Sequence, residues 1–225
     1  GAIAIVTPWF GAELKGGAEQ LAWQIATRLA ARSHPVEVLT TCCRSFLDDW
    51  AINHWPAGVT REAGFTLRRF PVDGRDRLAF DALNQQLLAR PADSLRPGVS
   101  PVAPDQAATW TQDNINSRAL ENHLSQHRND YSSFIFLPYL YGVILNGLPR
   151  VADRAFLQPC LHDEAYAYLP AIAAIFHQAH RLLFNSAGEQ ALAARLDGPA
   201  MLAKGVVVGE GIEFADLDAP QVERL

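Results

Sequence analysis

Residues 2–31, AIAIVTPWFGAELKGGAEQLAWQIATRLAA, hold a short apolar run, a turn with glycines and a helix-period segment, in that order. The run over residues 2–7 is continuously apolar, which is typical of a parallel strand that is buried on both faces. From Gly17 to Ala31 the apolar side chains recur every three or four residues, which predicts an amphipathic helix. A strand, a turn and a helix in this order open a βαβ unit and therefore a parallel sheet.

The same alternation continues along the chain. Residues 169–180 repeat the helical stripe, and Ser186 followed by Glu189 is a capping-box pattern that opens a short helix to Leu196. We therefore predict an α/β fold with a doubly wound, mainly parallel, Rossmann-like sheet and helices on both faces. Strands are expected at Ala2–Thr7, Val36–Thr41, Phe65–Phe70, Ser133–Leu137, Ala155–Gln158, Arg181–Asn185 and Gly205–Val208.

Three stretches do not fit this alternation: residues 42–64, 90–104 and 212–225. Residues 42–64 are long for a βα loop, and their Trp50, His54 and Trp55 favour a hydrophobic plug over the sheet edge, with stacking on a sugar ring as the alternative. Four prolines within residues 90–104 predict a surface excursion. We expect the Rossmann-like domain to occupy residues 1–211 and a linker to occupy residues 212–225.

Composition excludes several classes of protein. The chain has 225 residues, of which 49% are hydrophobic, so it can bury a core and is not extensively disordered. Its 19 basic and 24 acidic residues give a net charge of −5, without the basic face of a nucleic-acid binder. The apolar stretch over residues 134–148 is shorter than the ~20 residues of a membrane span. Three cysteines and no basic leader predict a reducing, cytoplasmic location.

The first candidate site is the turn after the opening strand. Its Gly16 and Gly17 precede a helix whose free N–H groups and positive dipole end suit a phosphate, and glycines let a ligand approach the backbone. The turn lies where ligands bind in an open α/β sheet, at the carboxyl ends of the strands. Its spacing is neither the dinucleotide fingerprint nor a Walker A loop, and a glycine-rich connection that binds nothing explains it equally well.

The second candidate site is His162-Asp163-Glu164, directly after the strand expected at Ala155–Gln158. A neutral imidazole can donate or accept a hydrogen bond, and a neighbouring carboxylate can fix its tautomer. Alternatively, Asp163 caps a helix with Glu164 in its first turn. Consecutive side chains diverge, so we predict no metal site here.

Four other histidines and one glutamate are weaker candidates. His177 and His180 fit ordinary positions on a helix surface, and His123 and His127 fit a solvated face at a polar helix end. Glu210 lies between two glycines in what is best explained as a plain exit turn.

In their order and spacing, four motifs resemble a family 4 (group 1) glycosyltransferase. They are the opening strand with Gly16-Gly17-Ala18-Glu19, the loop His162-Asp163-Glu164, the step Phe184-Asn185-Ser186 with Glu189, and the exit segment Val206–Gly211. Members of this family have the GT-B fold, in which two Rossmann-like domains face each other across a cleft. This chain resembles the N-terminal, acceptor-side half, because the family's donor-side pair of glutamates with seven residues between them is absent.

The resemblance implies a retaining enzyme that transfers a sugar from a nucleotide-sugar donor to a saccharide, lipid or small-molecule acceptor. It implies no cofactor and no metal, and a partnership with the protein's own C-terminal domain, without which this chain is expected to be inactive. His162 would be the catalytic residue in contact with the transferred sugar. The residues implied in substrate or donor binding are Gly16, Gly17, Glu19, Asp163 and Glu164.

Two other functions remain open at this stage. One is a non-catalytic α/β module that binds a sugar or a nucleotide. The weaker one is a metal-assisted hydrolase that uses the side chains of His162, Asp163 and Glu164. Many relatives of the resembled family contact a membrane surface, but the net charge of −5 and the lack of a basic helix give no support for such contact here.

Overall fold

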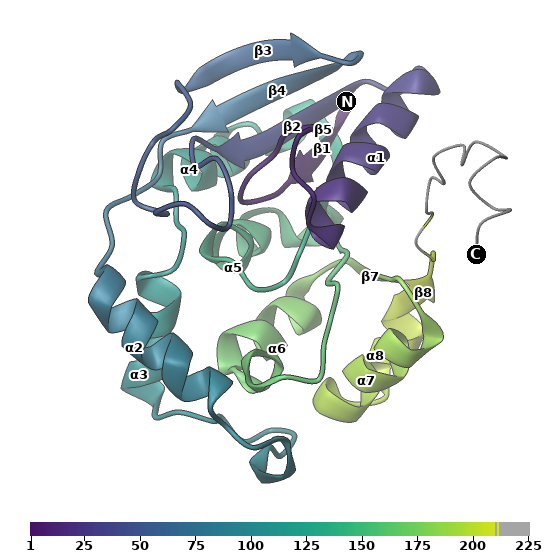
Figure 1. The fold of residues 1–225 in the computed structure, drawn as a ribbon. Coiled ribbons are helices and arrows are strands. Elements are labelled where there is room, and N and C mark those ends of the chain that lie inside the picture. The colour runs from purple at the N-terminus through teal and green to yellow at the C-terminus, as the bar shows by residue number, and fades with distance from the viewer. Residues whose placement is uncertain (210, 212–225) are drawn as a thin grey trace, which may run out of the picture.

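The computed structural model describes residues 1–209 and residue 211. It contains one eight-stranded sheet (Figure 1). The strands are β1 (Ala2–Val6), β2 (Val36–Thr41), β3 (Gly58–Glu62), β4 (Phe65–Phe70), β5 (Tyr131–Phe136), β6 (Ala155–Leu157), β7 (Arg181–Phe184) and β8 (Gly205–Val207). Their order is β3-β4-β2-β1-β5-β6-β7-β8, and every pair is parallel except β3 with β4.

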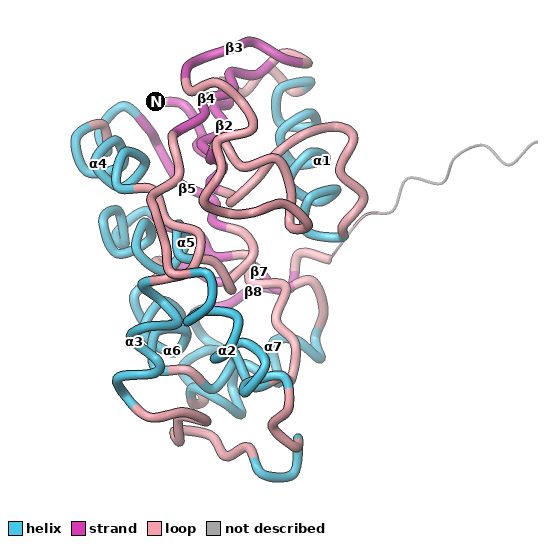
Figure 2. The backbone as a smooth tube through the Cα atoms, turned by 60° about the vertical axis from the view of Figure 1, so that its left-hand side comes forward, coloured by secondary structure: helices cyan, strands magenta, loops and turns pink. Residues whose placement is uncertain are grey.

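Helices lie on both faces of this sheet, as predicted (Figures 1 and 2). The α-helices are α1 (Gly17–Ala31), α2 (Arg77–Leu88), α3 (Pro104–Gln112), α4 (Arg118–Gln126), α5 (Gly142–Gly147), α6 (Pro170–Gln178), α7 (Ala187–Asp197) and α8 (Ala200–Lys204). Short 3₁₀ turns occur at Ala92–Ser94, Arg128–Asp130, Leu148–Arg154 and Ala165–Tyr168. Along β1, Ile5 packs into the cluster under α1, whereas Ala4 and Val6 pack into the larger cluster on the other face. Both faces of β1 are therefore buried, which explains its continuously apolar sequence.

All seven expected strands are present, with ends shifted by at most two residues. The sequence analysis missed β3, which lies inside the stretch read as a long loop. Its residues are almost all exposed, so it lacks the apolar pattern of the other strands. It pairs with β4 across a two-residue turn, Ala63-Gly64, in which both residues have positive φ, as a tight hairpin requires.

The expected helices are also present. Helix α6 begins at Pro170, whose missing N–H is not needed at the first position of a helix. Ser186 caps α7 by accepting a hydrogen bond from the Glu189 backbone N–H at 3.1 Å. Helix α2 was not predicted, and α4 was expected only as a polar helix end at His123 and His127. Asp76 and Ser117 nevertheless cap these helices in the same way. Residues 91–99 are mostly exposed, which confirms the predicted surface excursion.

In the long connection after β2, the Trp50 side chain packs among other aromatic rings. That ring packs 5.8 Å from Trp9, 5.4 Å from Phe80 and 5.7 Å from Tyr141, measured between ring centroids. This packing confirms the plug for Trp50. Trp55 remains partly exposed, with the Arg69 guanidinium 5.3 Å from its ring centroid.

Strand β1 sits at the point where the winding of the sheet reverses. The chain proceeds from β1 to β2 on one side and returns to β5 on the other. In doubly wound sheets such a reversal opens a crevice at the carboxyl ends of the two central strands. No helix in the described part is long and apolar enough to cross a membrane. The expected linker over residues 212–225, and Glu210, lie outside the described residues.

Candidate functional site

An open pocket of about 740 Å³ lies at the carboxyl ends of β1, β5, β6 and β7. It is therefore located in the crevice that the reversal of the sheet predicts. Four segments that follow these strands line it: Gly17 and Ala18; Pro138, Leu140 and Tyr141; Cys160, Leu161, His162 and Asp163; and Asn185, Ser186, Gly188, Glu189 and Leu192.

Two helices begin at this pocket. Helix α1 starts at Gly17, and no side chain caps its N-terminus. A Cβ atom on Gly17 would have no neighbour within 4 Å, so the backbone there faces open space. Helix α7 starts at Ala187, beside Ser186 and Gly188 of the pocket wall. The positive dipole ends of both helices favour negative charge at this place.

Gly16 and Glu19 lie next to this pocket without lining it. The Glu19 carboxylate accepts a hydrogen bond from Trp9 Nε1 at 2.6 Å and lies so close to Gly16 that a Cβ atom there would overlap it. Burial, together with the nearby Glu19 charge, raises the pKa of Tyr141, so this phenol stays neutral. Through its contacts with Trp9 and Gly16, Glu19 holds the glycine turn in shape.

The loop after β6 exposes His162 and anchors its neighbour. The Asp163 carboxylate accepts hydrogen bonds from the Tyr168 hydroxyl at 2.7 Å and from Arg195 Nη2 at 2.6 Å. The His162 side chain is exposed at the pocket and bonds to no other residue of the described chain. Its imidazole is therefore available to a ligand.

Glu164 turns away from the pocket. It accepts a hydrogen bond from the buried Tyr139 hydroxyl at 2.7 Å and does not line the pocket. The helix-cap alternative for Asp163 is wrong, because Glu164 is the residue that precedes the following 3₁₀ turn and neither side chain caps it. Asp163 is occupied instead by the side chains of Tyr168 and Arg195.

Glu189 joins two of the loops that form the site. Its buried carboxylate accepts hydrogen bonds from the backbone N–H of Leu161, at 2.6 Å, and from that of Asn185. Burial raises the pKa of Glu189, and these N–H groups oppose that shift. The sequence indicated a capping box, but it gave no sign that the carboxylate reaches the loop after β6.

Sequence reasoning also missed a chain of polar side chains that runs from the buried Gln158 to Asn185 and Cys160 in the pocket wall. Gln158 Nε2 donates to Asn185 Oδ1 at 2.8 Å, and Asn185 Nδ2 lies 3.6 Å from Cys160 Sγ. Cys160 has a φ of +54°, a left-handed conformation that is costly for a residue with a side chain. Such strain occurs often at functional sites, and no sequence pattern signals it.

Within the described part of the chain, the remaining histidines and acidic residues do not form a metal site. Among the described residues, no three His, Cys, Asp or Glu side chains gather closely enough to hold a metal ion. His177 and His180 are both exposed, but only His177 lies on a helix as expected, because α6 ends at Gln178. His123 is not solvated, and that expectation is wrong: it is partly buried, and its Nε2 lies 2.9 Å from the Tyr131 hydroxyl.

No protein-family model matches this chain, and no curated protein matches its sequence. Among solved structures the chain is similar to trehalose-6-phosphate synthase (OtsA), with a TM-score of 0.54 and 16% identity. The match covers 95% of this chain and 50% of that protein. This chain has the fold of one GT-B half. It therefore spans about half the length of that GT-B glycosyltransferase, and at this identity the likeness shows the fold alone.

Proposed function

We propose that this chain is the acceptor-side half of a glycosyltransferase, which moves a sugar from a nucleotide-sugar donor to a saccharide, lipid or small-molecule acceptor. The observation that carries this proposal is the pocket at the reversal point of a GT-B-type sheet, where two helix N-termini and the free His162 imidazole meet. The motifs that resemble family 4 support a retaining reaction.

The two helix N-termini would act on the charge of the donor. When the sugar leaves, negative charge grows on the departing nucleoside diphosphate. Preorganised N–H groups and helix dipoles stabilise such charge without reorganising during the reaction. Gly17 of α1 and Gly188 of α7 leave the backbone open to this approach.

His162 would contact the transferred sugar. The loop that carries it is held from two sides, by Arg195 on Asp163 and by Glu189 on Leu161. An exposed side chain on an anchored backbone can orient a sugar hydroxyl without first paying the cost of ordering its own loop. Asp163, Glu164, Gly16 and Glu19 then act by holding the walls of the site, and Asp163 also borders the ligand.

The donor would be held largely by a second domain across the cleft, so this chain alone is expected to bind weakly and to transfer nothing. Catalysis by positioning needs both walls of the cleft. No resident metal or cofactor is part of this mechanism.

The test is turnover by the full-length gene product. It is assayed with a panel of nucleotide sugars and simple acceptors, and release of nucleoside diphosphate is followed. Wild type is compared with His162→Ala and with His34→Ala, a matched change at an exposed histidine before β2. We expect turnover in wild type and His34→Ala, and a loss of at least tenfold in His162→Ala. A protein that binds sugars but releases no nucleoside diphosphate from any donor would be a binding module instead.

A further inference from the structure

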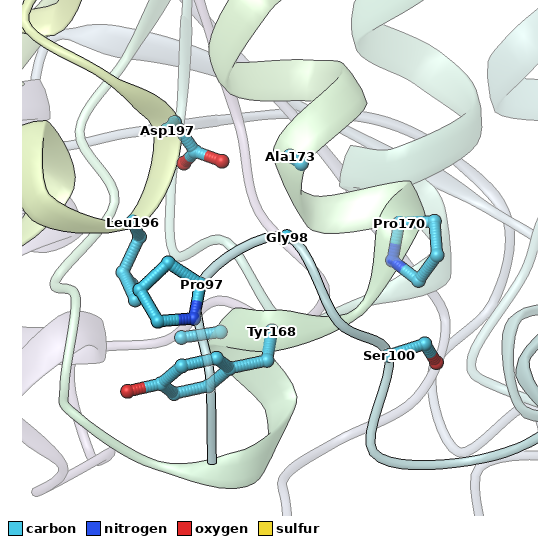
Figure 3. A pocket seen from close by; sticks show the side chains of 9 residues that line it. Pro97, Gly98, Ser100, Tyr168, Pro170, Ala173, Leu196 and Asp197 are labelled. Atoms are coloured by element: carbon cyan, nitrogen blue, oxygen red, sulfur yellow. The ribbon is translucent and has the colours of Figure 1, made fainter.

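A second, smaller pocket lies away from the candidate site, at the other end of α7. It has a volume of about 240 Å³ and is built by the loop over residues 97–100, the 3₁₀ turn Ala165–Tyr168 and the helices α6 and α7 (Figure 3). At roughly 30 Å³ per water-sized group, it has room for about eight non-hydrogen atoms. It fits a small organic molecule.

Asp197 is the charged group of this pocket. Its partly buried carboxylate points toward the side where Ala173 and Gly98 lie (Figure 3). It makes no hydrogen bond or ion pair with another described residue, and burial raises its pKa. It is also the last residue of α7, where the negative end of the helix dipole disfavours a carboxylate. A cation would relieve both costs.

No basic group in the described part of the chain forms an ion pair with the Asp197 carboxylate. The Arg195 guanidinium is bonded to the Asp163 carboxylate and the Tyr168 hydroxyl. His177, on α6, is exposed and acts on Asp197 through its charge without a hydrogen bond.

The other walls are apolar and aromatic. Pro97, Leu196 and Pro170 supply aliphatic surface, and the ring of Tyr168 lies beside Pro97 (Figure 3). The Tyr168 hydroxyl donates a hydrogen bond to Asp163, so the aromatic ring and not the hydroxyl lines this pocket. Aromatic faces attract organic cations, and hydrocarbon walls favour an alkyl group over a bare metal ion.

From this combination we propose a binding site for a small organic ammonium ion, a primary amine on a compact hydrocarbon, whose charge pairs with Asp197. The site is separate from the proposed transferase pocket. Tyr168 connects the two, because its ring lines this pocket while its hydroxyl holds Asp163 of the other. The proposal does not depend on the transferase activity.

The test is calorimetric titration of the chain at pH 8 with cyclohexylamine, with its neutral isostere cyclohexanol and with cyclohexanecarboxylate. We expect saturable amine binding, at least tenfold tighter than that of the alcohol, and none for the carboxylate. Asp197→Asn should weaken amine binding at least tenfold and bring it close to that of the alcohol. Asp105→Asn, at an exposed carboxylate on α3, is the matched control and should change nothing.

A second variant distinguishes the contribution of the Asp197 charge from that of the pocket volume. Ala173→Leu fills the pocket and leaves Asp197 in place, so it should abolish binding of both the amine and the alcohol. Thermal unfolding confirms that each variant is folded. The proposal is overturned if the amine does not saturate, if it binds no better than cyclohexanol, or if folded Asp197→Asn binds it as well as wild type does.

Discussion

The buried carboxylate of Glu189 accepts a hydrogen bond from the backbone N–H of Leu161 at 2.6 Å, and so α7 holds the loop that presents His162. The same carboxylate accepts from the Asn185 N–H. One side chain thus fixes the loops after two neighbouring strands. The relative position of His162 and the N-terminus of α7 depends on it.

Removing this carboxylate should destabilise the chain. Glu189→Ala leaves two backbone N–H groups without their acceptor, and each unpaired buried donor costs about 1–3 kcal/mol. We expect a loss of about 2–4 kcal/mol in urea unfolding, and faster hydrogen exchange at Leu161. Glu189→Gln keeps one acceptor oxygen and should lose less. The control, Glu13→Ala at an exposed position, should change little; equal effects of the two alanine variants would show that Glu189 holds nothing.

The two adjacent glycines should respond differently to the same added methyl group. In Gly16→Ala the new Cβ overlaps the Glu19 carboxylate, whose hydrogen bond to Trp9 must then shift, at a cost of about 1–3 kcal/mol. In Gly17→Ala the Cβ meets open space at the start of a helix, and stability should hold or rise by up to about 1 kcal/mol. Thermal unfolding of the pair measures the difference. A similar loss in both variants would contradict the placement of Gly17 at the open wall.

The free energy of unfolding should decrease as the pH is lowered, because of His123. Burial, aided by the nearby Arg68 charge, lowers the pKa of this imidazole from its ordinary 6.5 to about 4. As the pH falls from 7 to 4, His123 becomes protonated in the unfolded chain but stays largely neutral in the folded chain. Folding stability therefore declines in this window. After solvent screening the decline is about 1–3 kcal/mol. Urea unfolding at pH 7 and pH 5 should show a smaller decline for His123→Gln than for wild type or His34→Gln. Parallel declines in all three would contradict this prediction.

The three cysteines should differ in reactivity. Cys42 and Cys43 are buried, and burial raises the pKa of both thiols, that of Cys43 to about 11. Cys160 is partly accessible and lines the candidate site. Limited treatment with iodoacetamide should therefore modify Cys160 first, as mass spectrometry of tryptic peptides can show. Preferential labelling of Cys42 or Cys43 in folded protein would be inconsistent with this structure.

Most of the sheet could be predicted from the sequence, because strands buried on both faces leave an unmistakable apolar run. Strand β3 could not, since an exposed edge strand has no such run and forms only because β4 offers a partner. In the site, the positions of Gly17 and His162 follow from the rule that ligands bind at the carboxyl ends of strands. The pairing of Asp163 with Arg195, which joins residues 32 positions apart, depends on how α7 packs and is not encoded locally.

The most direct test of the proposed site is amide chemical-shift mapping of this chain with nucleotide sugars, free nucleoside diphosphates and simple sugars. At least one ligand should shift the amides of Gly17, His162 and Ser186, which three separate strands bring to one pocket. Gly17→Leu, which places a side chain into that opening, should remove these shifts while the fold persists. Shifts confined to another part of the sheet, or shifts that are unchanged in Gly17→Leu, would contradict the assignment of this pocket as the sugar-transfer site.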